Sequence, residues 1–147
     1  MKNIIAIASD HAGYELKEII KAHLNSMGIE YEDYGTYNDT CVDYPDMIHP
    51  IASDINKNKF EKGIIICGSG NGVAMTANKY LNVRAALCWT PEVAKFARLH
   101  NDANIVSLPA RFIDADTAKE IVTVFLTTAF EGGRHLRRVD KIKNIIS

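Results

Sequence analysis

The chain has 147 residues, 47% of them hydrophobic and 24% charged, with a formal net charge of −1. This length suits one domain with one core over residues 1–147. The balanced charge and the lack of a bilayer-length apolar run argue against a nucleic-acid or membrane partner, so any anion must be recognised locally. The cysteines, Cys41, Cys67 and Cys88, form no zinc-ligand pattern and indicate free thiols in a reducing, cytoplasmic setting.

Short apolar segments alternate with helical patterns along the chain. The predicted strands cover residues 3–9, 29–34, 63–67, 84–89 and 104–108. The helices with predicted bounds cover about 13–27, 73–80, 90–101, 115–130 and 134–145, and a long polar loop covers 35–46. Strands without a polar face suit a parallel sheet that is covered on both sides. The pattern therefore predicts a three-layer α/β/α Rossmann-like fold with a five-stranded parallel sheet and a C-terminal helix.

Ligands in such folds bind beyond the carboxyl ends of the strands, so polar residues there are the candidates for a site. We expect one side of the sheet to gather a thiol, histidines, carboxylates and an arginine: Asp10 and His11 after the first strand, Asp43 and Tyr44 in the long loop, Cys67 with the glycine-rich segment after it, His100, Asn101 and Asp102 at the end of the helix after the fourth strand, and Arg111 after the fifth strand.

The glycine-rich loop Cys67-Gly68-Ser69-Gly70-Asn71-Gly72 is the most informative stretch. Alternating glycines allow several backbone N–H groups to converge on one point, and the start of the next helix adds its positive dipole end. The alternative is a tight turn that binds nothing. Val73 stands where a dinucleotide fingerprint needs glycine and a cysteine-phosphatase loop needs arginine, and no Gly-Lys-Ser/Thr is present. The loop therefore holds a phosphate or stabilises charge made by chemistry at Cys67.

Each candidate side chain also has a structural interpretation. A free cysteine is usually a small buried hydrophobe, but N–H groups and a helix N-terminus favour the thiolate at Cys67. His100 can simply complement a helix C-terminus, and Asp10 can be an N-cap. Arginines and a lysine fall within an arc of about 100° on the last helix, which indicates either a solvated basic face, favoured for the lysine, or forks for a phosphate: Arg134, Arg137, Arg138 and Lys141.

Several short motifs follow one another along nearly the whole chain: Asp10-His11-Ala12-Gly13, Asp43-Tyr44-Pro45, Cys67 to Gly72, Ala77-Asn78-Lys79, Arg84-Ala85, His100-Asn101-Asp102-Ala103-Asn104 and Glu131-Gly132-Gly133-Arg134-His135. Together they resemble ribose-5-phosphate isomerase type B, whose wider family includes galactose-6-phosphate and allose-6-phosphate isomerases. The resemblance implies an aldose–ketose isomerase of the pentose phosphate pathway that needs no cofactor and no metal. It also implies a homodimer with active sites at the subunit interface.

The resemblance further implies roles for individual residues. Cys67 is the implied base and His100 the implied acid, with Asp43 or Asp10 assisting ring opening and Ser69 moving protons between substrate oxygens. The implied substrate-binding residues include Arg134 and Arg138, which serve the partner subunit's site: Asp10, His11, Gly68, Ser69, Gly70, Asn71, Gly72, Asn101, Arg111, Arg134 and Arg138. His11 and the arginines then hold the phosphate, which leaves the loop N–H groups for a cis-enediolate oxygen.

Four questions stay open at this point. The chain can be a flavodoxin-like module that binds a phosphorylated ligand without converting it. It can also be one subunit of a hetero-oligomeric hexose-phosphate isomerase, although one chain holds the whole set of implied catalytic residues. Preference for a pentose or a hexose phosphate depends on the depth of the pocket, and pairing of dimers into tetramers is equally open.

Overall fold

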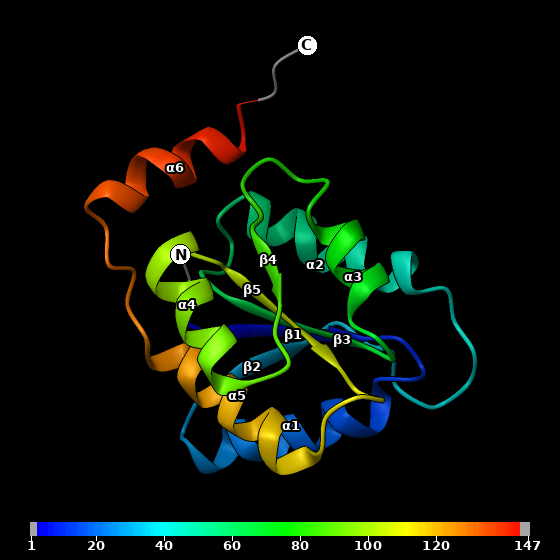
Figure 1. Ribbon diagram of the computed structural model, residues 1–147. Helices are drawn as coiled ribbons and strands as arrows, with labels where there is room; N and C mark the ends of the chain where they lie inside the picture. The colour runs from blue at the N-terminus through cyan, green and yellow to red at the C-terminus, as the bar shows by residue number, and fades with distance from the viewer. Residues whose placement is uncertain (1–2, 145–147) are drawn as a thin grey trace.

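A computed structural model describes residues 3–144 and has an all-parallel sheet between two layers of helices (Figure 1). The strand order is β2-β1-β3-β5-β4, and the bounds are β1 Ile5–Ser9, β2 Tyr31–Asp33, β3 Gly63–Cys67, β4 Ala85–Leu87 and β5 Ile105–Pro109. The predicted five-stranded α/β/α fold is thereby confirmed. β2 and β4 are half as long as predicted, because both lie at edges and pair on one side only.

Within residues 3–144, six helices connect and follow the strands: α1 Tyr14–Ser26, α2 Tyr44–Asn56, α3 Asn71–Ala77, α4 Pro91–Asn101, α5 Ala115–Thr127 and α6 Arg134–Ile142. The sequence prediction gave no bounds for α2 and extended the polar loop to residue 46. In the structure Asp43 is the N-cap of α2, and Pro45 lies in its first turn, where a missing N–H costs nothing. The predicted end of α6 at residue 145 lies outside the described residues.

Each face of the sheet has its own apolar core. α1, α4 and α5 cover one face and pack on side chains such as Ile64, Ile66 and Val106. α2 and α3 cover the other face and pack on Ile65 and Cys67. Because successive residues of a strand point to opposite faces, the run Ile64-Ile65-Ile66-Cys67 serves both cores, and Cys67 enters the α2/α3 side.

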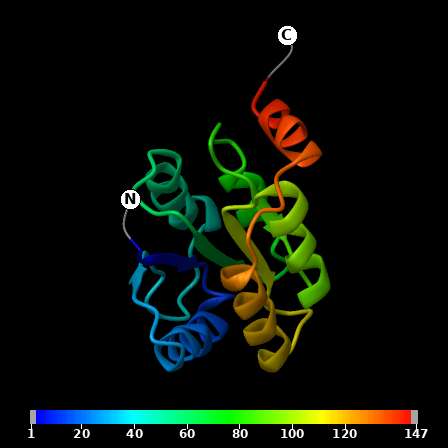
Figure 2. The ribbon, with the colours of Figure 1, turned by 90° about the vertical axis from the view of Figure 1, so that its left-hand side faces the viewer.

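Helix α6 lies beside the end of α4 and projects from the rest of the molecule (Figure 2). His135 and Val139 are its buried residues, whereas Arg134 and Arg138 are exposed. Within residues 3–144, none of the helices has the length and apolar character that a bilayer crossing requires.

An ion pair between α1 and the end of β2 fixes the start of the long loop. Lys17 on α1 is fully buried, and its Nζ donates to both Asp33 oxygens at 2.6 and 2.7 Å. The same carboxylate accepts from Lys21 Nζ at 2.9 Å and from the Gly35 N–H at 2.8 Å. Burial raises the pKa of the Asp33 carboxyl, but these hydrogen bonds outweigh it, so the pKa lies below its usual range. The carboxylate thus ties α1 and β2 to the start of the loop that carries Asp43.

We expect Asp33→Asn to lower the free energy of unfolding by about 3 kcal/mol at pH 7, because Lys17 then keeps a buried charge without its hydrogen-bonded counter-ion and retains only Glu18 at 3.8 Å. Urea denaturation measures this loss. A carboxyl with a depressed folded pKa stabilises the fold above its unfolded pKa of about 3.9, and that stabilisation disappears as the pH falls through the folded value. The difference between wild type and variant should therefore shrink below about pH 4. Asp39→Asn, at an exposed loop position, is the control, and an equal effect there would contradict the prediction.

Candidate active site

The carboxyl ends of three neighbouring strands carry most of the predicted site. In the register of the sheet, Ser9 of β1 pairs with Ile66, and Cys67 of β3 pairs with Pro109 of β5. The segments that follow these strands therefore meet at one edge, as predicted: Asp10 and His11, Cys67 with Gly68 to Gly72, and Arg111. Asp43, at the start of α2, belongs to the same edge because Tyr44 beside it contacts Gly72.

The Cys67 side chain is buried beneath the glycine-rich loop, with 5% of the residue exposed. Its Sγ accepts a hydrogen bond from the Gly70 N–H at 3.2 Å, an interaction that stabilises negative charge on the sulfur. Gly70 has a φ of +75°, and its carbonyl accepts from the buried Ser107 hydroxyl at 2.7 Å. A Cβ at this position would lie 2.5 Å from the Leu87 Cδ1, so both conformation and space require glycine.

Two side chains form walls around this loop. The Tyr44 ring lies so close to Gly72 that a Cβ there would be 2.5 Å from Cε1 of the ring. The Arg111 guanidinium lies along Gly68, where a Cβ would be 3.1 Å from Nη1, and the Arg111 N–H donates to the Gly68 carbonyl at 2.9 Å. An exposed arginine and a tyrosine thus border the thiol and its N–H groups.

Asp10 and His11 lie beside the glycine-rich loop, and each side chain already makes a hydrogen bond within the chain. The buried Asp10 carboxylate accepts from the Gly13 N–H at 3.0 Å, in the turn before α1; Gly13, and not Asp10, is the N-cap of that helix. His11 Nδ1 accepts from the Val42 N–H at 3.2 Å, and its Nε2 lies 3.5 Å from the Cys41 Sγ. Since Nδ1 acts as the acceptor, Nε2 is the nitrogen that carries the proton of a neutral His11 and can donate it to an anion.

The expectation that His100, Asn101 and Asp102 join this edge is wrong for a single chain. A helix that follows a parallel strand returns to the amino end of the sheet, so α4 ends four residues before β5 begins. The length of β5 then separates this helix end from the carboxyl edge by about 13 Å, at ~3.3 Å per residue. Arg134 and Arg138 lie on α6, beside the same end of α4. Within one chain, the predicted site residues therefore form two groups that lie at opposite ends of the sheet.

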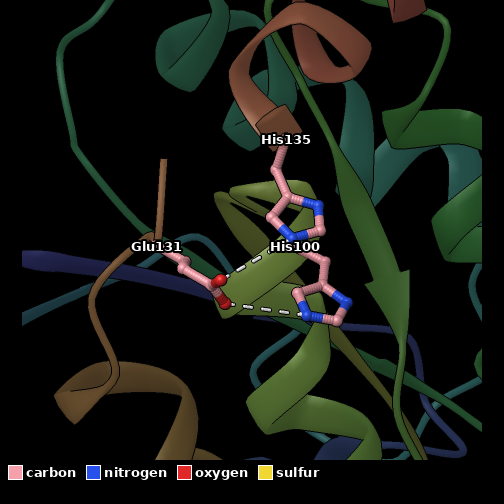
Figure 3. A group of neighbouring side chains, drawn as sticks. All are labelled: His100, Glu131 and His135. Carbon is pink, nitrogen blue, oxygen red and sulfur yellow. Dashed lines mark ion pairs between the residues drawn. The ribbon is translucent and has the colours of Figure 1, made fainter. Parts of the chain in front are cut away.

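His100 is half-exposed and lies within a small cluster of its own (Figure 3). Its ring stacks on the buried His135 ring, with a centroid distance of 4.2 Å and an interplanar angle of 13°. The Glu131 carboxylate lies beside both rings, at 3.7 Å from His100 Nε2 and 3.9 Å from His135 Nε2. Desolvation lowers the pKa of His135, and the neighbouring His100 and Arg134 lower it further against the opposing effect of Glu131.

These three residues have the side-chain types of a metal site, with ligand atoms within 4.8 Å of one another. Their geometry does not suit one. An imidazole binds a metal ion in the plane of its ring, at about 2.0–2.1 Å for zinc. The planes of two rings that stack at 4.2 Å and lie within 13° of parallel do not meet within metal-bonding distance of both rings. The arrangement fits a proton-binding pair better than a metal centre.

The sequence prediction did not assign roles to four residues that lie next to predicted site residues: Cys41, Tyr44, Glu131 and His135. Tyr44 and Cys41 had a signal in the sequence, since they flank Asp43 in the polar loop. Glu131 and His135 flank a double glycine, and Gly132 and Gly133 both adopt positive φ angles of +71° and +57°. That bend turns α6 back over the end of α4, which the sequence pattern alone does not reveal.

Comparison with known proteins finds relatives of one family that match nearly the full length of this chain. Residues 5–142 match the family described as Ribose/Galactose Isomerase. "Ribose-5-phosphate isomerase B" of Escherichia coli is 39% identical over 141 residues, which is 96% of this chain and 95% of the relative. "Probable ribose-5-phosphate isomerase B" of Mycoplasma genitalium is 46% identical over 140 residues, covering 94% and 92%.

Solved structures agree with these relatives. The crystal structure of a ribose 5-phosphate isomerase from Thermotoga maritima is 50% identical, has a TM-score of 0.95 and covers 99% of this chain and 100% of its own. The Mycoplasma genitalium enzyme, solved with bound ribulose 5-phosphate, is 44% identical with a TM-score of 0.92, covering 98% and 96%. With matched sequence, matched fold and the thiol-bearing loop in place, the chain belongs to the ribose/galactose isomerase family.

Proposed function

We propose that the protein is a ribose-5-phosphate isomerase of type B, which interconverts ribose 5-phosphate and ribulose 5-phosphate without a cofactor. The observation that carries this proposal is the likeness, over 98% of the chain, to an enzyme solved with bound ribulose 5-phosphate. The thiol under a loop of backbone N–H groups fits the chemistry, since isomerisation needs a base and a stabilised oxyanion. The three free cysteines support a reducing, cytoplasmic location.

The reaction begins with a closed furanose ring. His100 donates a proton to the ring oxygen as the C1–O bond breaks, and Asp43 or Asp10 accepts the proton of the C1 hydroxyl as the aldehyde forms. The Cys67 thiolate then removes the proton from C2, which gives a cis-enediolate. N–H groups of the Gly68 to Gly72 loop stabilise the enediolate oxygen, while Ser69 moves a proton between O1 and O2. Return of a proton to C1 gives ribulose 5-phosphate.

The distant phosphate group is bound by His11, Arg111, Arg134 and Arg138. Arginine forks match phosphate oxygens, and the Nε2–H of His11 adds a donor. Arg111 lies beside the glycine loop, so it fits a phosphate at one end of a short substrate whose other end meets Cys67. Binding energy at the phosphate positions C2 at the thiol.

We further propose that the active form is a homodimer whose sites form at the subunit interface. A proton donor must come within about 2.6–3.2 Å of the atom it serves, and the length of β5 keeps His100 and Cys67 of one chain too far apart to share one substrate. A second copy that brings its α4 end and α6 to the carboxyl edge completes the site with His100, Asn101, Arg134 and Arg138. Exposed apolar side chains at Trp89, Phe96 and Phe112 fit a buried face in such a dimer.

The substrate proposal is tested by assaying ribose 5-phosphate, allose 6-phosphate and galactose 6-phosphate side by side, with chelator and without added cofactor. We expect ribose 5-phosphate to have the highest kcat/KM, by about tenfold or more, since each mispaired polar group in a site costs about 1–3 kcal/mol. A preference for either hexose phosphate would contradict the pentose assignment. Tight binding without conversion of any of the three would favour a non-catalytic binding module.

Cys67→Ala should abolish exchange of the C2 proton of ribose 5-phosphate with deuterated solvent while substrate binding persists. Loss of the base leaves the oxyanion donors in place but removes proton abstraction, a loss of about 10²–10⁴-fold. NMR measures the exchange, and calorimetry measures binding. Cys88→Ala is the matched control, because burial raises the pKa of that thiol to about 12 and keeps it neutral. Unchanged exchange in Cys67→Ala would show that another group is the base.

Mixing two inactive variants tests the shared site. Cys67→Ala and His100→Ala subunits, co-expressed with different tags, should form mixed dimers with one intact site made of Cys67 from one subunit and His100 from the other. Random assembly should restore about a quarter of wild-type activity, because half of the dimers are mixed and one of their two sites is intact. Each variant alone is the control. If both residues acted within one chain, mixing would restore nothing.

A further inference from the structure

The segment between α5 and α6 places one carboxylate against two stacked histidines (Figure 3). The two Glu131 oxygens face different rings: Oε2 lies 3.7 Å from His100 Nε2, and Oε1 lies 3.9 Å from His135 Nε2. Figure 3 also shows that the other ring nitrogen of His100, Nδ1, points away from Glu131. One nitrogen of His100 therefore lies within ion-pair distance of a carboxylate, and the other points outward, where it can exchange a proton with a ligand.

Backbone contacts hold Glu131 in this position. Its N–H donates to the Leu99 carbonyl at 3.1 Å, one of the carbonyls that the end of α4 leaves without a helical partner. Just upstream, the Thr128 carbonyl accepts from Arg98 Nε at 3.0 Å. The segment is thus fixed to the last turn of α4 by bonds that do not involve the Glu131 side chain, which leaves the carboxylate without a structural task in these contacts.

The stacked pair can hold only one proton at little cost. Two imidazolium rings with centroids 4.2 Å apart repel each other, whereas one imidazolium beside one carboxylate is neutral in sum. His135 is 5% exposed, and its Nε2 makes no hydrogen bond within the described residues. Desolvation lowers the pKa of His135, and His100, Arg134 and Arg138 act in the same direction. The more exposed His100 is the ring of the pair that a ligand can reach.

We propose that Glu131 is a positioning residue that keeps His100 protonated, with Nδ1–H directed outward, while the stacked His135 stays neutral and fixes the plane of the ring. This inference deepens the proposed isomerase function and rests on it. In ring opening, the proton leaves Nδ1 for the ring oxygen as the C1–O bond breaks, and the C1 hydroxyl proton passes to a carboxylate. Glu131 exchanges no proton in this step. It stabilises the charge on His100 before the transfer.

Other charged groups around the pair act against Glu131. Arg134 and Arg138 of α6 disfavour a second positive charge at the histidines. Arg98 of α4 is engaged elsewhere, since its Nη1 donates to Asp102 Oδ1 at 2.9 Å and to the Ala103 carbonyl at 2.7 Å. Among these groups, Glu131 is the carboxylate that faces His100, so removing its charge should shift the proton equilibrium of His100 in a single direction.

Glu131→Gln in the full-length enzyme tests this inference with two substrates. Ribulose 5-phosphate cannot close a five-membered ring because its C5 oxygen carries the phosphate, so exchange of its C1 proton with D2O needs no ring opening. We expect kcat for ribose 5-phosphate to fall about tenfold above neutral pH. In the plot of kcat against pH, the high-pH limb of the variant should lie about one pH unit below that of the wild type. Exchange from ribulose 5-phosphate should stay within about twofold of wild type. Glu131→Asp, which keeps the charge, should recover part of the loss.

The NMR titration of the His100 Hε1 proton gives a second readout that does not depend on turnover. Its midpoint should move to lower pH in Glu131→Gln and stay in place in Glu120→Gln, a control on the exposed side of α5. An unmoved midpoint, or equal losses for both substrates with an unchanged pH limb, would overturn the inference and leave Glu131 a purely structural role. Wild-type protein that does not convert ribose 5-phosphate, but whose His100 midpoint responds to Glu131→Gln, would overturn the proposed function alone.

Discussion

The return path of the crossover helices governs the organisation of this protein. In a parallel sheet each helix must carry the chain from the carboxyl end of one strand to the amino end of the next. A side chain at a strand end and one at the end of a crossover helix therefore lie at opposite ends of the domain, as Cys67 and His100 do. The same rule places α6, which follows α5 and packs beside α4, at the end of the sheet that holds His100. A reaction that needs both groups thus requires a second copy of the chain.

The glycine-rich loop is built around the thiol and does not form an open phosphate cradle. The Gly70 N–H is committed to the Cys67 sulfur, and the Asn71 N–H donates to the Ser69 hydroxyl at 3.3 Å. The helix that follows spans only Asn71–Ala77, so its dipole is small. Two of the N–H groups that the sequence pattern offers to an anion are therefore engaged within the loop. In the proposed site, formal positive charge for the phosphate comes instead from arginines, of which Arg111 lies against the loop.

The sequence predicted what depends on local pattern and missed what depends on pairing. Ile64-Ile65-Ile66-Cys67 identified a central strand because both of its faces are buried. The same pattern made the edge strands β2 and β4 too long, since hydrophobicity does not tell how many neighbours a strand has. α2 was not delimited because Pro45 and Pro50 interrupt its helical pattern. The order of the strands follows from long-range contacts that no local motif encodes. The separation of His100 from Cys67 follows instead from the return path of the crossover helix, which the search for polar residues at strand ends did not take into account.

The two halves of the proposed site place Cys67 and His100 in surroundings of opposite charge. Because the halves lie apart within one chain, neither side chain alters the charge of the other. The Gly70 N–H donates to the Cys67 sulfur and Arg111 lies against the same loop, whereas the Glu131 carboxylate lies 3.7 Å from His100 Nε2. If these groups faced each other within one subunit, the thiolate and the imidazolium would pair directly and their proton would be lost to that pair. In the proposed dimer, a composite interface would bring them to opposite sides of a substrate. The sugar would then lie between the proposed base of one subunit and the proposed acid of the other.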